Sequence, residues 1–439
     1  MSIIAAKCPH CKVTVVDMNA SRISAWNSES LPIYEPGLLE IVRSTRGRNL
    51  FFSTDINAAI RDSELIFVSV NTPTKTSGEG AGKAADLQYW EKVARDILRE
   101  CDTPRIVVEK STLPVMTART MEDILNANRN GIHFEVVSNP EFLAEGTAIH
   151  DLLEPDRVLI GSHETPEGLR ARQELIELYA NWVPRERIIT SDVWSTELAK
   201  LAANAFLAQR ISSINSISAL CEETGSDVAQ IGRAVGLDSR IGTRFLNVSA
   251  GFGGSCFKKD ILNLVYICQS RGLHEVAAYW ESVLAINEYQ RHRFVRKILR
   301  AMSGTVSGKR LALFGFAFKA GTCDTRESTA AFVARKLAEE RARVVVTDPR
   351  ALENARVHLG EPGGDFEFLE DPYEAAAGAN AVAIMTEWEL YRLLDWKRIH
   401  DSMRKPAFIF DGRNILDHER LFDMGFNVYP LGCKPLVHD

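Results

Sequence analysis

One stretch, residues 251–260, carries the side chains best suited to covalent chemistry. It reads Gly-Phe-Gly-Gly-Ser-Cys-Phe-Lys-Lys-Asp, with three glycines within four positions ahead of Cys256. Clustered glycines indicate backbone that bends sharply or approaches a ligand closely. A thiol beside cations and backbone amides can have a lowered pKa and act as a nucleophile. The alternative is a surface turn followed by a buried cysteine.

Other polar groups follow predicted strands or share a helix face. Residues 70–74, 110–114 and 139–146 each come after an apolar run, and the third segment carries Glu141 and Glu145. Ligands of open α/β sheets bind beyond the carboxyl ends of the strands, so these loops are well placed to contact a cofactor. Lys200 and Asn204 are four residues apart and therefore lie on one helix face. Ordinary loop chemistry and solvated polar residues are the alternatives.

The elements that position these groups follow a βαβ pattern in the N-terminal third. β-Branched runs predict strands at residues 12–16, 64–70, 105–109, 134–138 and 158–161. Amphipathic stretches predict helices at residues 87–100, 114–126 and 165–181, with Pro114 in the first turn of the second.

A long helix and a second α/β unit follow. The helix is expected over residues 195–223, closed by Gly225, with a length of roughly 40 Å. A strand from Arg310, a turn at Gly315, a helix through Ala338 and a strand ending in Asp348 open the second unit, with further strands at residues 381–385 and 407–410. We predict an α/β protein with two Rossmann-like doubly wound domains joined by a long central helix. The predicted domains are residues 1–192, 193–305 and 306–439.

Asp17 ends the first visible strand, where an acidic residue hydrogen-bonds the cofactor ribose and favours NAD over NADP. By itself an Asp after a strand is mostly a turn former. A strand and a G-x-G-x-x-G turn should precede it by about twenty residues, and neither is present. We therefore expect that the first strand of the N-terminal domain is absent and that two sheet edges are open. Weak NAD binding and poor activity follow as expectations.

The totals exclude several classes of protein. The chain has 439 residues, 45% of them hydrophobic and 25% charged, with net charge −6 and no basic tract, which argues against nucleic-acid binding. It has no apolar run of membrane-spanning length and no signal peptide. Eight scattered cysteines indicate a reducing, cytoplasmic setting. Cys8 and Cys11 form a C-x-x-C, which we interpret as part of a helix-to-strand connection and not as a redox or metal site.

Residues 251–260, 139–146, 70–74 and 315–319, together with Lys200 and Asn204, resemble the UDP-glucose 6-dehydrogenase family, most closely its animal members. The resemblance implies NAD-dependent, four-electron oxidation of UDP-glucose to UDP-glucuronate, with no metal. It implies that Cys256 forms a thiohemiacetal and then a thioester.

The resemblance also implies the other roles. It makes Glu141 the acid/base of thioester hydrolysis, Lys200 and Asn204 the pair that orients the sugar oxygen, and Asp260 and Thr112 the residues that position water. The implied NAD contacts are Asp17, Arg22, Val70, Asn71, Thr72, Pro73, Thr74, Ser111, Thr112, Leu113, Glu145, Cys256, Lys259 and Arg326. The implied UDP-sugar contacts are Glu141, Phe142, Leu143, Ala144, Glu145, Lys200, Asn204, Arg240, Asn247, Val248, Ser249, Ala250, Gly251, Phe252, Gly253, Phe318, Lys319 and Arg413.

Arg413 is expected to come from a neighbouring subunit, which implies a homo-oligomer; animal members form hexamers built from dimers. Two alternatives stay open. One is a non-catalytic, truncated subunit that binds UDP-sugar and oligomerises but binds NAD poorly. The other is a cysteine hydrolase, which needs a histidine near Cys256.

Overall fold

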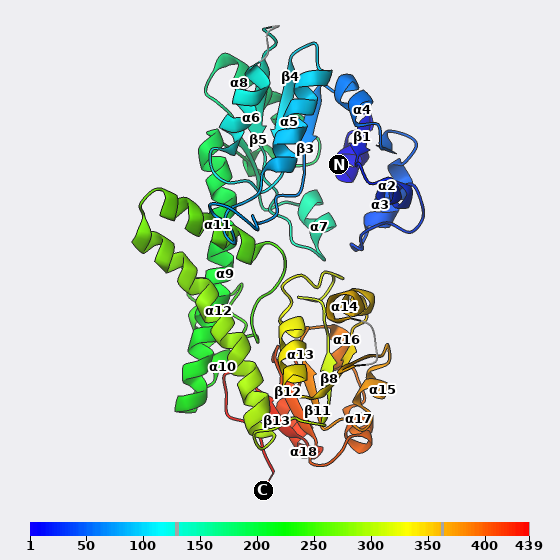
Figure 1. Ribbon diagram of the computed structural model, residues 1–439, viewed down its shortest axis with the longest axis vertical. Coiled ribbons are helices and arrows are strands. Elements are labelled where there is room, and N and C mark those ends of the chain that lie inside the picture. The colour runs from blue at the N-terminus through cyan, green and yellow to red at the C-terminus, as the bar shows by residue number, and fades with distance from the viewer. Residues whose placement is uncertain (128–130, 361–363, 439) are drawn as a thin grey trace. The chain divides into compact units, whose positions relative to one another are not determined.

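The computed structural model describes residues 1–127, 131–360 and 364–438, and the chain divides into two α/β units (Figure 1). The first unit comprises Met1–Ala203 and Leu262–Ala277, and the second comprises Asn204–Ile261 and Ala278–Asp439. Across the described ranges, none of the helices combines the length and apolar character that a membrane span requires.

The first unit contains two separate ladders of strands. The smaller pairs β1 (Val13–Val16) with β2 (Leu50–Ser53). The larger runs, in spatial order, through β3 (Leu65–Val68), β4 (Arg105–Glu109), β5 (Phe134–Ser138), β6 (Val158–Gly161) and β7 (Ile188–Ser191). Neighbours are parallel, apart from β5 and β6. Within the described ranges, no hydrogen bonds of the sheet join the β1–β2 ladder to β3.

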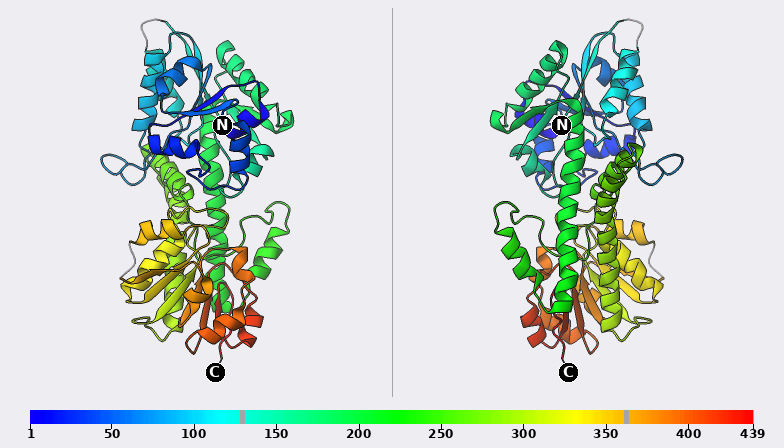
Figure 2. Two further views of the ribbon diagram at one scale, coloured as in Figure 1. Left: turned by 90° about the vertical axis from the view of Figure 1, so that its right-hand side faces the viewer. Right: turned by 90° about the vertical axis from the view of Figure 1, so that its left-hand side faces the viewer.

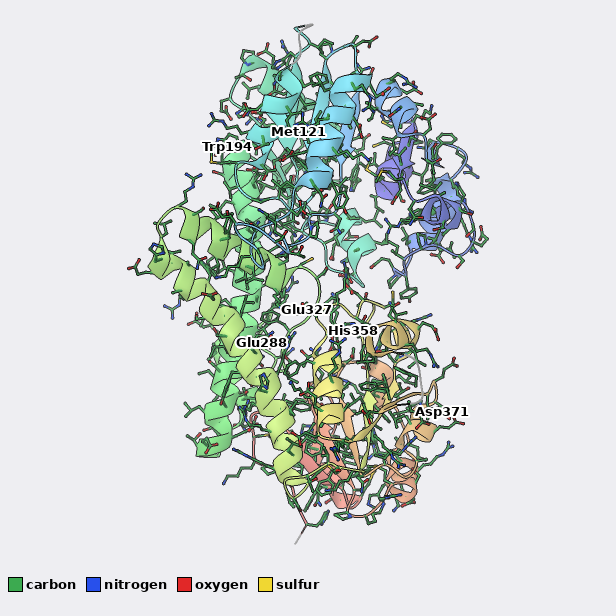
Figure 3. The ribbon with its side chains drawn as sticks, viewed as in Figure 1. Met121, Trp194, Glu288, Glu327, His358 and Asp371 are labelled. Atoms are coloured by element: carbon green, nitrogen blue, oxygen red, sulfur yellow. The ribbon has the colours of Figure 1, made fainter. Side chains whose placement is uncertain are left out.

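Alternating side chains hold the helices of the first unit to the larger sheet. Val107 and Val136 pack with α5 (Gln88–Glu100) and α6 (Thr117–Asn126), the latter through Met121, which is labelled in Figure 3. The next residues along the same strands, Val108 and Val137, pack with α8 (Pro166–Tyr179) on the other face. This period of two is what a parallel sheet covered on both faces requires.

The second unit is built on one parallel sheet with the order β10-β9-β8-β11-β12-β13. Because the chain starts in the middle at β8 and moves outward first one way and then the other, this is the doubly wound Rossmann order. Leu311 and Leu313 of β8 face α13 (Thr329–Glu339) and α12 (His274–Ala301), whereas Ala312 and Phe314 face the other side. The strands are β8 (Arg310–Phe314), β9 (Arg343–Thr347), β10 (Phe366–Phe368), β11 (Ala381–Ile384), β12 (Phe408–Asp411) and β13 (Asn427–Pro430).

Long helices accompany this sheet. The predicted long helix is confirmed as α9 (Val193–Thr224), seen as the long green helix in Figure 2, and Gly225 follows it with a φ of +76°. Its 32 residues span about 48 Å. It is followed by α10 (Val228–Gly236), α11 (Phe257–Ser270) and α12 (His274–Ala301). Within the second unit α9 packs on α12, where the Ser212 hydroxyl donates to the Val283 carbonyl at 2.8 Å.

Two local predictions have different outcomes. Cys8 and Cys11 lie in the connection between α1 (Ser2–Lys7) and β1, as predicted, and burial raises the pKa of the Cys8 thiol to about 11. The helix expected from Pro114 begins only at Thr117, so the prediction of Pro114 in its first turn is wrong. The remaining helices are α2 (Ala20–Trp26), α3 (Leu38–Thr45), α4 (Ile56–Asp62), α7 (Ala148–Leu153), α13 (Thr329–Glu339), α14 (Leu352–Leu359), α15 (Pro372–Ala376), α16 (Glu389–Arg392), α17 (Trp396–Ser402) and α18 (His418–Asp423).

Candidate active site

The glycines ahead of Cys256 allow the loop to pack closely on the segment that follows β8. A Cβ atom on Gly253 would lie 2.5 Å from the Glu327 carbonyl oxygen, and one on Gly254 would lie 2.9 Å from the Phe318 ring. Gly254 also has a φ of +84°, which a residue with a side chain rarely adopts. Glycine is therefore required at both positions by the protein's own packing.

Cys256 directly precedes α11 and its side chain is exposed. The Ser255 hydroxyl lies 3.6 Å from its sulfur. One turn into α11, the buried Asp260 carboxylate accepts a hydrogen bond of 2.6 Å from the Asn204 side chain on α9. The second unit thus brings together three predicted catalytic residues. Lys258, which follows the cysteine, forms an ion pair with Glu327 at 2.9 Å.

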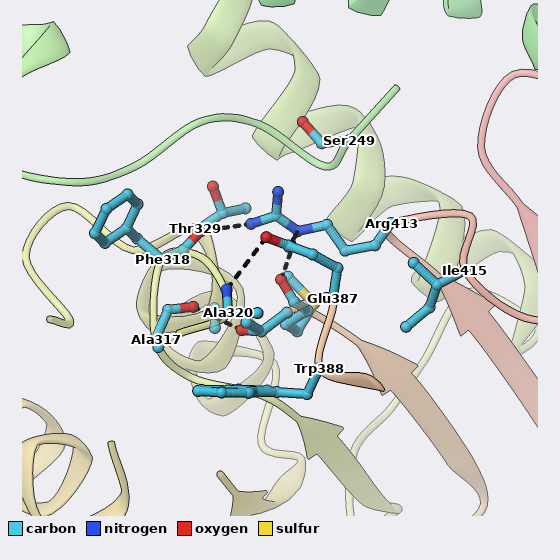
Figure 4. Close-up of polar contacts among 12 residues, drawn as sticks. Ser249, Ala317, Phe318, Ala320, Thr329, Glu387, Trp388, Arg413 and Ile415 are labelled. Carbon is cyan, nitrogen blue, oxygen red and sulfur yellow. Dashed lines mark hydrogen bonds and ion pairs between the residues drawn. The ribbon is translucent and has the colours of Figure 1, made fainter. Parts of the chain in front are cut away.

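Arg413 lies beside Phe318 in the same chain (Figure 4). Its guanidinium donates to the Phe318 carbonyl at 2.7 Å and to the Met385 carbonyl at 2.8 Å, and Glu387 lies 3.2 Å from it. The expectation that Arg413 reaches the site of a neighbouring subunit stays a prediction. Burial raises the pKa of Glu387, but the Arg413 charge, two backbone hydrogen bonds and the Lys319 charge together outweigh it, and the net pKa is lowered.

Most of the other predicted residues of the second unit lie beside the loop that carries Cys256, but Arg240 does not. Ser249 and Ala250 are buried, and their amides bond to the Asn215 side chain at 2.9 Å and to the Gly412 carbonyl at 2.9 Å. The Arg326 carbonyl accepts from Gly254, whereas its guanidinium pairs with Asp324 at 2.6 Å. Arg240 is not placed with them: its side chain is 86% exposed and pairs with Asp238. Of the remaining predicted residues, Val248 is buried and Asn247 is exposed. Lys259 lies in the first turn of α11, and the Lys319 ammonium lies over the Phe318 ring.

In the first unit, the loops after β3 and β4 bond to each other. The Ser111 hydroxyl accepts from the Val70 amide at 2.8 Å, and the Thr72 hydroxyl donates to the Thr112 carbonyl at 3.0 Å. The predicted cofactor segments at residues 70–74 and 111–113 therefore meet at one edge of the sheet. Asp17 and Arg22 pair at 2.8 Å at the end of β1, in the smaller ladder.

Glu141 lies at the centre of a charged cluster in the first unit. Its carboxylate pairs with Lys110 at 3.0 Å, and its carbonyl accepts from the Lys200 ammonium. The Phe142 ring lies between two cations, 4.0 Å from Arg157 and 5.3 Å from Lys200. Further along this loop, where Leu143 and Glu145 are half-buried, Ala144 donates to Asp151 and Gly146 donates to Glu35.

Several residues of these clusters were not predicted from the sequence. In the first unit this is Tyr179, whereas Lys110 and Asn139 begin two of the predicted loops without having been given a role. The lysine lies 3.0 Å from the Asn139 amide oxygen and 3.2 Å from the Tyr179 hydroxyl. Burial lowers the pKa of Lys110, but Tyr179 and Glu141 outweigh it, so the net pKa is raised. Its position beside Ser111 was the available signal. In the second unit the unpredicted residues are Asn287, Arg291 and Thr329, which bond to the cysteine loop.

Two buried carboxyl groups lie next to these loops. Glu197 accepts from the amides of Met116 and Ala118 at the start of α6, and burial raises its pKa to about 7. Burial, and then the charge of Glu197, raise the pKa of Glu109 well above its usual value. Both groups are thus protonated more readily in the folded state than in the unfolded one.

The free energy of unfolding is therefore expected to fall as the pH rises. Glu197 causes this fall between pH 4.5 and about 7, and Glu109 extends it to higher pH. Throughout this window the folded state binds more protons, so raising the pH favours unfolding. Glu109→Gln mimics the neutral carboxyl group and should reduce the fall in melting temperature, measured by calorimetry. A fall equal to that of the unsubstituted protein would show that Glu109 does not contribute.

The fold and these loops define a protein of two nucleotide-binding units with an exposed thiol at a helix start. Residues 1–183, 194–289 and 312–418 match the NAD-binding, central and UDP-binding domains of the UDP-glucose/GDP-mannose dehydrogenase family. The chain belongs to this family.

The relatives extend over nearly the whole chain. UDP-glucose 6-dehydrogenase 4 from Oryza sativa subsp. japonica is 56% identical over 99% of this chain and 94% of its own length, and UDP-glucose 6-dehydrogenase 4 from Arabidopsis thaliana has the same identity and coverage. A UDP-glucose dehydrogenase structure from Pyrobaculum islandicum has a TM-score of 0.85 at 33% identity, over 98% of this chain and 94% of that one. These relatives are plant and archaeal proteins, so they do not support the expected likeness to animal members in particular.

Proposed function

We propose that this chain is an NAD-dependent oxidoreductase that converts UDP-glucose to UDP-glucuronate. The observation that carries the proposal is the 56% identity to plant UDP-glucose 6-dehydrogenases over 99% of the chain. Cys256 supports the proposal, because an exposed thiol can add to an aldehyde. It directly precedes α11, and one turn into this helix Asp260 is bonded to Asn204 of α9.

The first unit fits the cofactor, because its polar loops adjoin the carboxyl ends of β3 and β4 and Asp17 ends β1. Residues 70–74, 111–113, Arg22, Glu145, Lys259 and Arg326 are proposed to contact it, and Asp17 is proposed to select NAD over NADP. Held by these residues, NAD would supply the hydride acceptor for both oxidations.

The chain's own residues supply the covalent chemistry. After the C6 alcohol has lost a hydride and a proton, the Cys256 sulfur bonds to the aldehyde carbon, giving a thiohemiacetal. Loss of a second hydride and a proton leaves a thioester, and water releases the carboxylate and the thiol. Glu141 would move the proton of this water, and Lys200 would stabilise charge on the sugar oxygen. Asn204 would orient that oxygen, and Thr112 and Asp260 would position water.

The UDP-sugar contacts are proposals of the same kind. They comprise residues 141–145, residues 247–253, Lys200, Asn204, Arg240, Phe318, Lys319 and Arg413. Among these, Arg413 and Phe318 are already joined by a hydrogen bond. The domain boundaries at 192/193 and 305/306 and a cytoplasmic location also stay proposals.

The test is NADH formation by the purified chain with UDP-glucose and NAD, together with detection of UDP-glucuronate. NADH formation that requires UDP-glucose is the expected result, at a low rate if NAD binding is as weak as the sequence predicts. A non-catalytic subunit is the second candidate, favoured by the separation of the β1–β2 ladder from the β3–β7 sheet. UDP-glucose binding in calorimetry without NAD binding or NADH formation would establish that candidate instead.

We also propose that the chain forms a homo-oligomer through α9. Phe206, Ile217 and Leu220 are spaced by 11 and 3 residues, so they share one helix face, and they are 60%, 38% and 59% exposed. Large apolar side chains aligned on one face are typical of a subunit interface.

Phe206→Asp combined with Leu220→Asp is expected to shift the protein to a smaller species, because two charges would be buried at the contact. Analytical ultracentrifugation measures the change. Leu393→Asp, at an exposed apolar side chain just after α16 and outside α9, is the control and should leave the mass unchanged. An unchanged mass in the double variant would exclude this face as the interface.

A further inference from the structure

The backbone of Phe252, four residues before Cys256, is held on both sides by one buried amide. The Asn287 side chain on α12 accepts from the Phe252 amide at 2.8 Å and donates to the Phe252 carbonyl at 3.1 Å. Asn287 is 3% exposed, so these two bonds are shielded from water.

Arg291, one turn further along α12, joins this loop to a second segment. One terminal nitrogen donates to the Phe252 carbonyl at 2.7 Å and to the Glu327 carbonyl at 2.7 Å. Its charge is met by Glu288 at 2.9 Å and Glu327 at 4.0 Å, both of which are labelled in Figure 3. Arg291 is 4% exposed, and a buried apolar side chain of similar size could not join the two carbonyls.

Thr329 completes the arrangement from α13. Its hydroxyl donates to the Gly251 carbonyl at 3.0 Å, and the side chain is 3% exposed. We name Asn287, Arg291 and Thr329 the loop clamp. The clamp holds two consecutive residues of the cysteine loop from two different helices.

The held residue is linked to the thiol over a short path. The Phe252 ring contacts the ring of Phe257, the first residue of α11, with centroids 5.8 Å apart. Between them, Gly254 is tied to the Arg326 carbonyl at 3.0 Å. Cys256 therefore lies on a segment anchored at Phe252, at Gly254 and at the start of α11.

Building on the proposed function, we propose that the loop clamp positions the Cys256 sulfur for attack on the aldehyde. Asn287, Arg291 and Thr329 are positioning residues, because they act through the backbone of Gly251 and Phe252. A displacement of ~1 Å at a reacting atom can lower a rate about 100-fold. Capture of the aldehyde therefore depends on the clamp more strongly than the first oxidation does.

The test is Arg291→Lys, which keeps the charge but replaces the planar fork with one ammonium group. We expect kcat to fall about 10- to 100-fold, with a KM for UDP-glucose within about threefold of the unsubstituted value. With semicarbazide present as an aldehyde trap, NADH formed per UDP-glucuronate should rise above two, and the trapped aldehyde should be detectable by mass spectrometry. Arg300→Lys, the same change at the exposed end of α12, is the control and should keep the ratio at two.

Thr329→Val is the second variant, since it removes only the bond to Gly251 and nearly preserves the shape. Thr329→Val should also raise the ratio of NADH to UDP-glucuronate, but by less than Arg291→Lys. It provides the test of the loop clamp if the Arg291→Lys protein does not fold. Folded variants with an unchanged kcat, or with a lower kcat and no trapped aldehyde, would overturn the positioning role. If the unsubstituted chain forms no NADH, the proposed function itself is contradicted. The failure of the proposed function can therefore be told apart from the failure of the clamp.

Discussion

Cys256→Ser is expected to abolish net formation of UDP-glucuronate, with a loss of more than about 1,000-fold, as is usual when a nucleophile is removed. A hydroxyl is far less ionised than a thiol and adds poorly to an aldehyde, and any ester it formed would turn over slowly. The first oxidation does not use the thiol, so a little aldehyde and NADH should remain. Product formation followed by mass spectrometry measures the loss.

The matched control is Cys11→Ser, because Cys11 is a half-buried cysteine in the connection between α1 and β1. It should form UDP-glucuronate at the unsubstituted rate. If Cys256→Ser keeps its kcat, the thioester route is excluded and another residue must carry the acyl group.

Glu141→Gln is expected to lower the steady-state rate about 100- to 1,000-fold, within the range for loss of a general acid or base. The amide is nearly the same size as the carboxylate but does not take up the proton of the attacking water. Hydrolysis should therefore become the slow step, with a rapid initial phase of NADH formation followed by a slow one. Stopped-flow absorbance separates the two phases.

Glu141 also forms an ion pair with Lys110, so the loss of this pair needs its own control. Lys110→Met removes the pair from the other side and leaves the carboxylate in place. If both variants lose activity without an initial NADH phase, the effect is structural, and Glu141 is not the acid/base of hydrolysis.

Much of the fold could be predicted because its signals are local. The strands at residues 105–109, 134–138 and 158–161 were predicted with the bounds that the structure has, since each short segment contains at least two β-branched residues. β2 and β7 were not predicted. Each has only four residues, and apolar side chains such as Phe51 and Ile189 are exposed, so the sequence does not alternate between apolar buried and polar exposed positions. For these two, pairing with a neighbour decides the structure.

The candidate site was also predicted only in part. Spacing suggested Cys256, Lys200 with Asn204, and the loops at strand ends, but their roles came from the family resemblance. The contact between Arg413 and Phe318 within one chain was not predicted, because it depends on β12 lying beside β11 and β11 beside β8 in the sheet of the second unit. The order of strands in a sheet cannot be read from a single sequence.

The loop clamp shows the same limit. Asn287 and Arg291 are polar residues four apart on a long helix, a pattern that usually indicates a solvent-facing surface. Only the packing of α12 against the cysteine loop buries them and turns them toward the carbonyl groups.

The central claim is that the oxidised sugar passes through a thioester on Cys256. Its most direct test is mass spectrometry of peptides from Glu141→Gln protein mixed with UDP-glucose and NAD and then quenched in acid. We predict an added acyl group on the peptide that contains Cys256, formed only when both compounds are present. NADH formation with no adduct on this peptide, or with the adduct on another residue, would contradict the account.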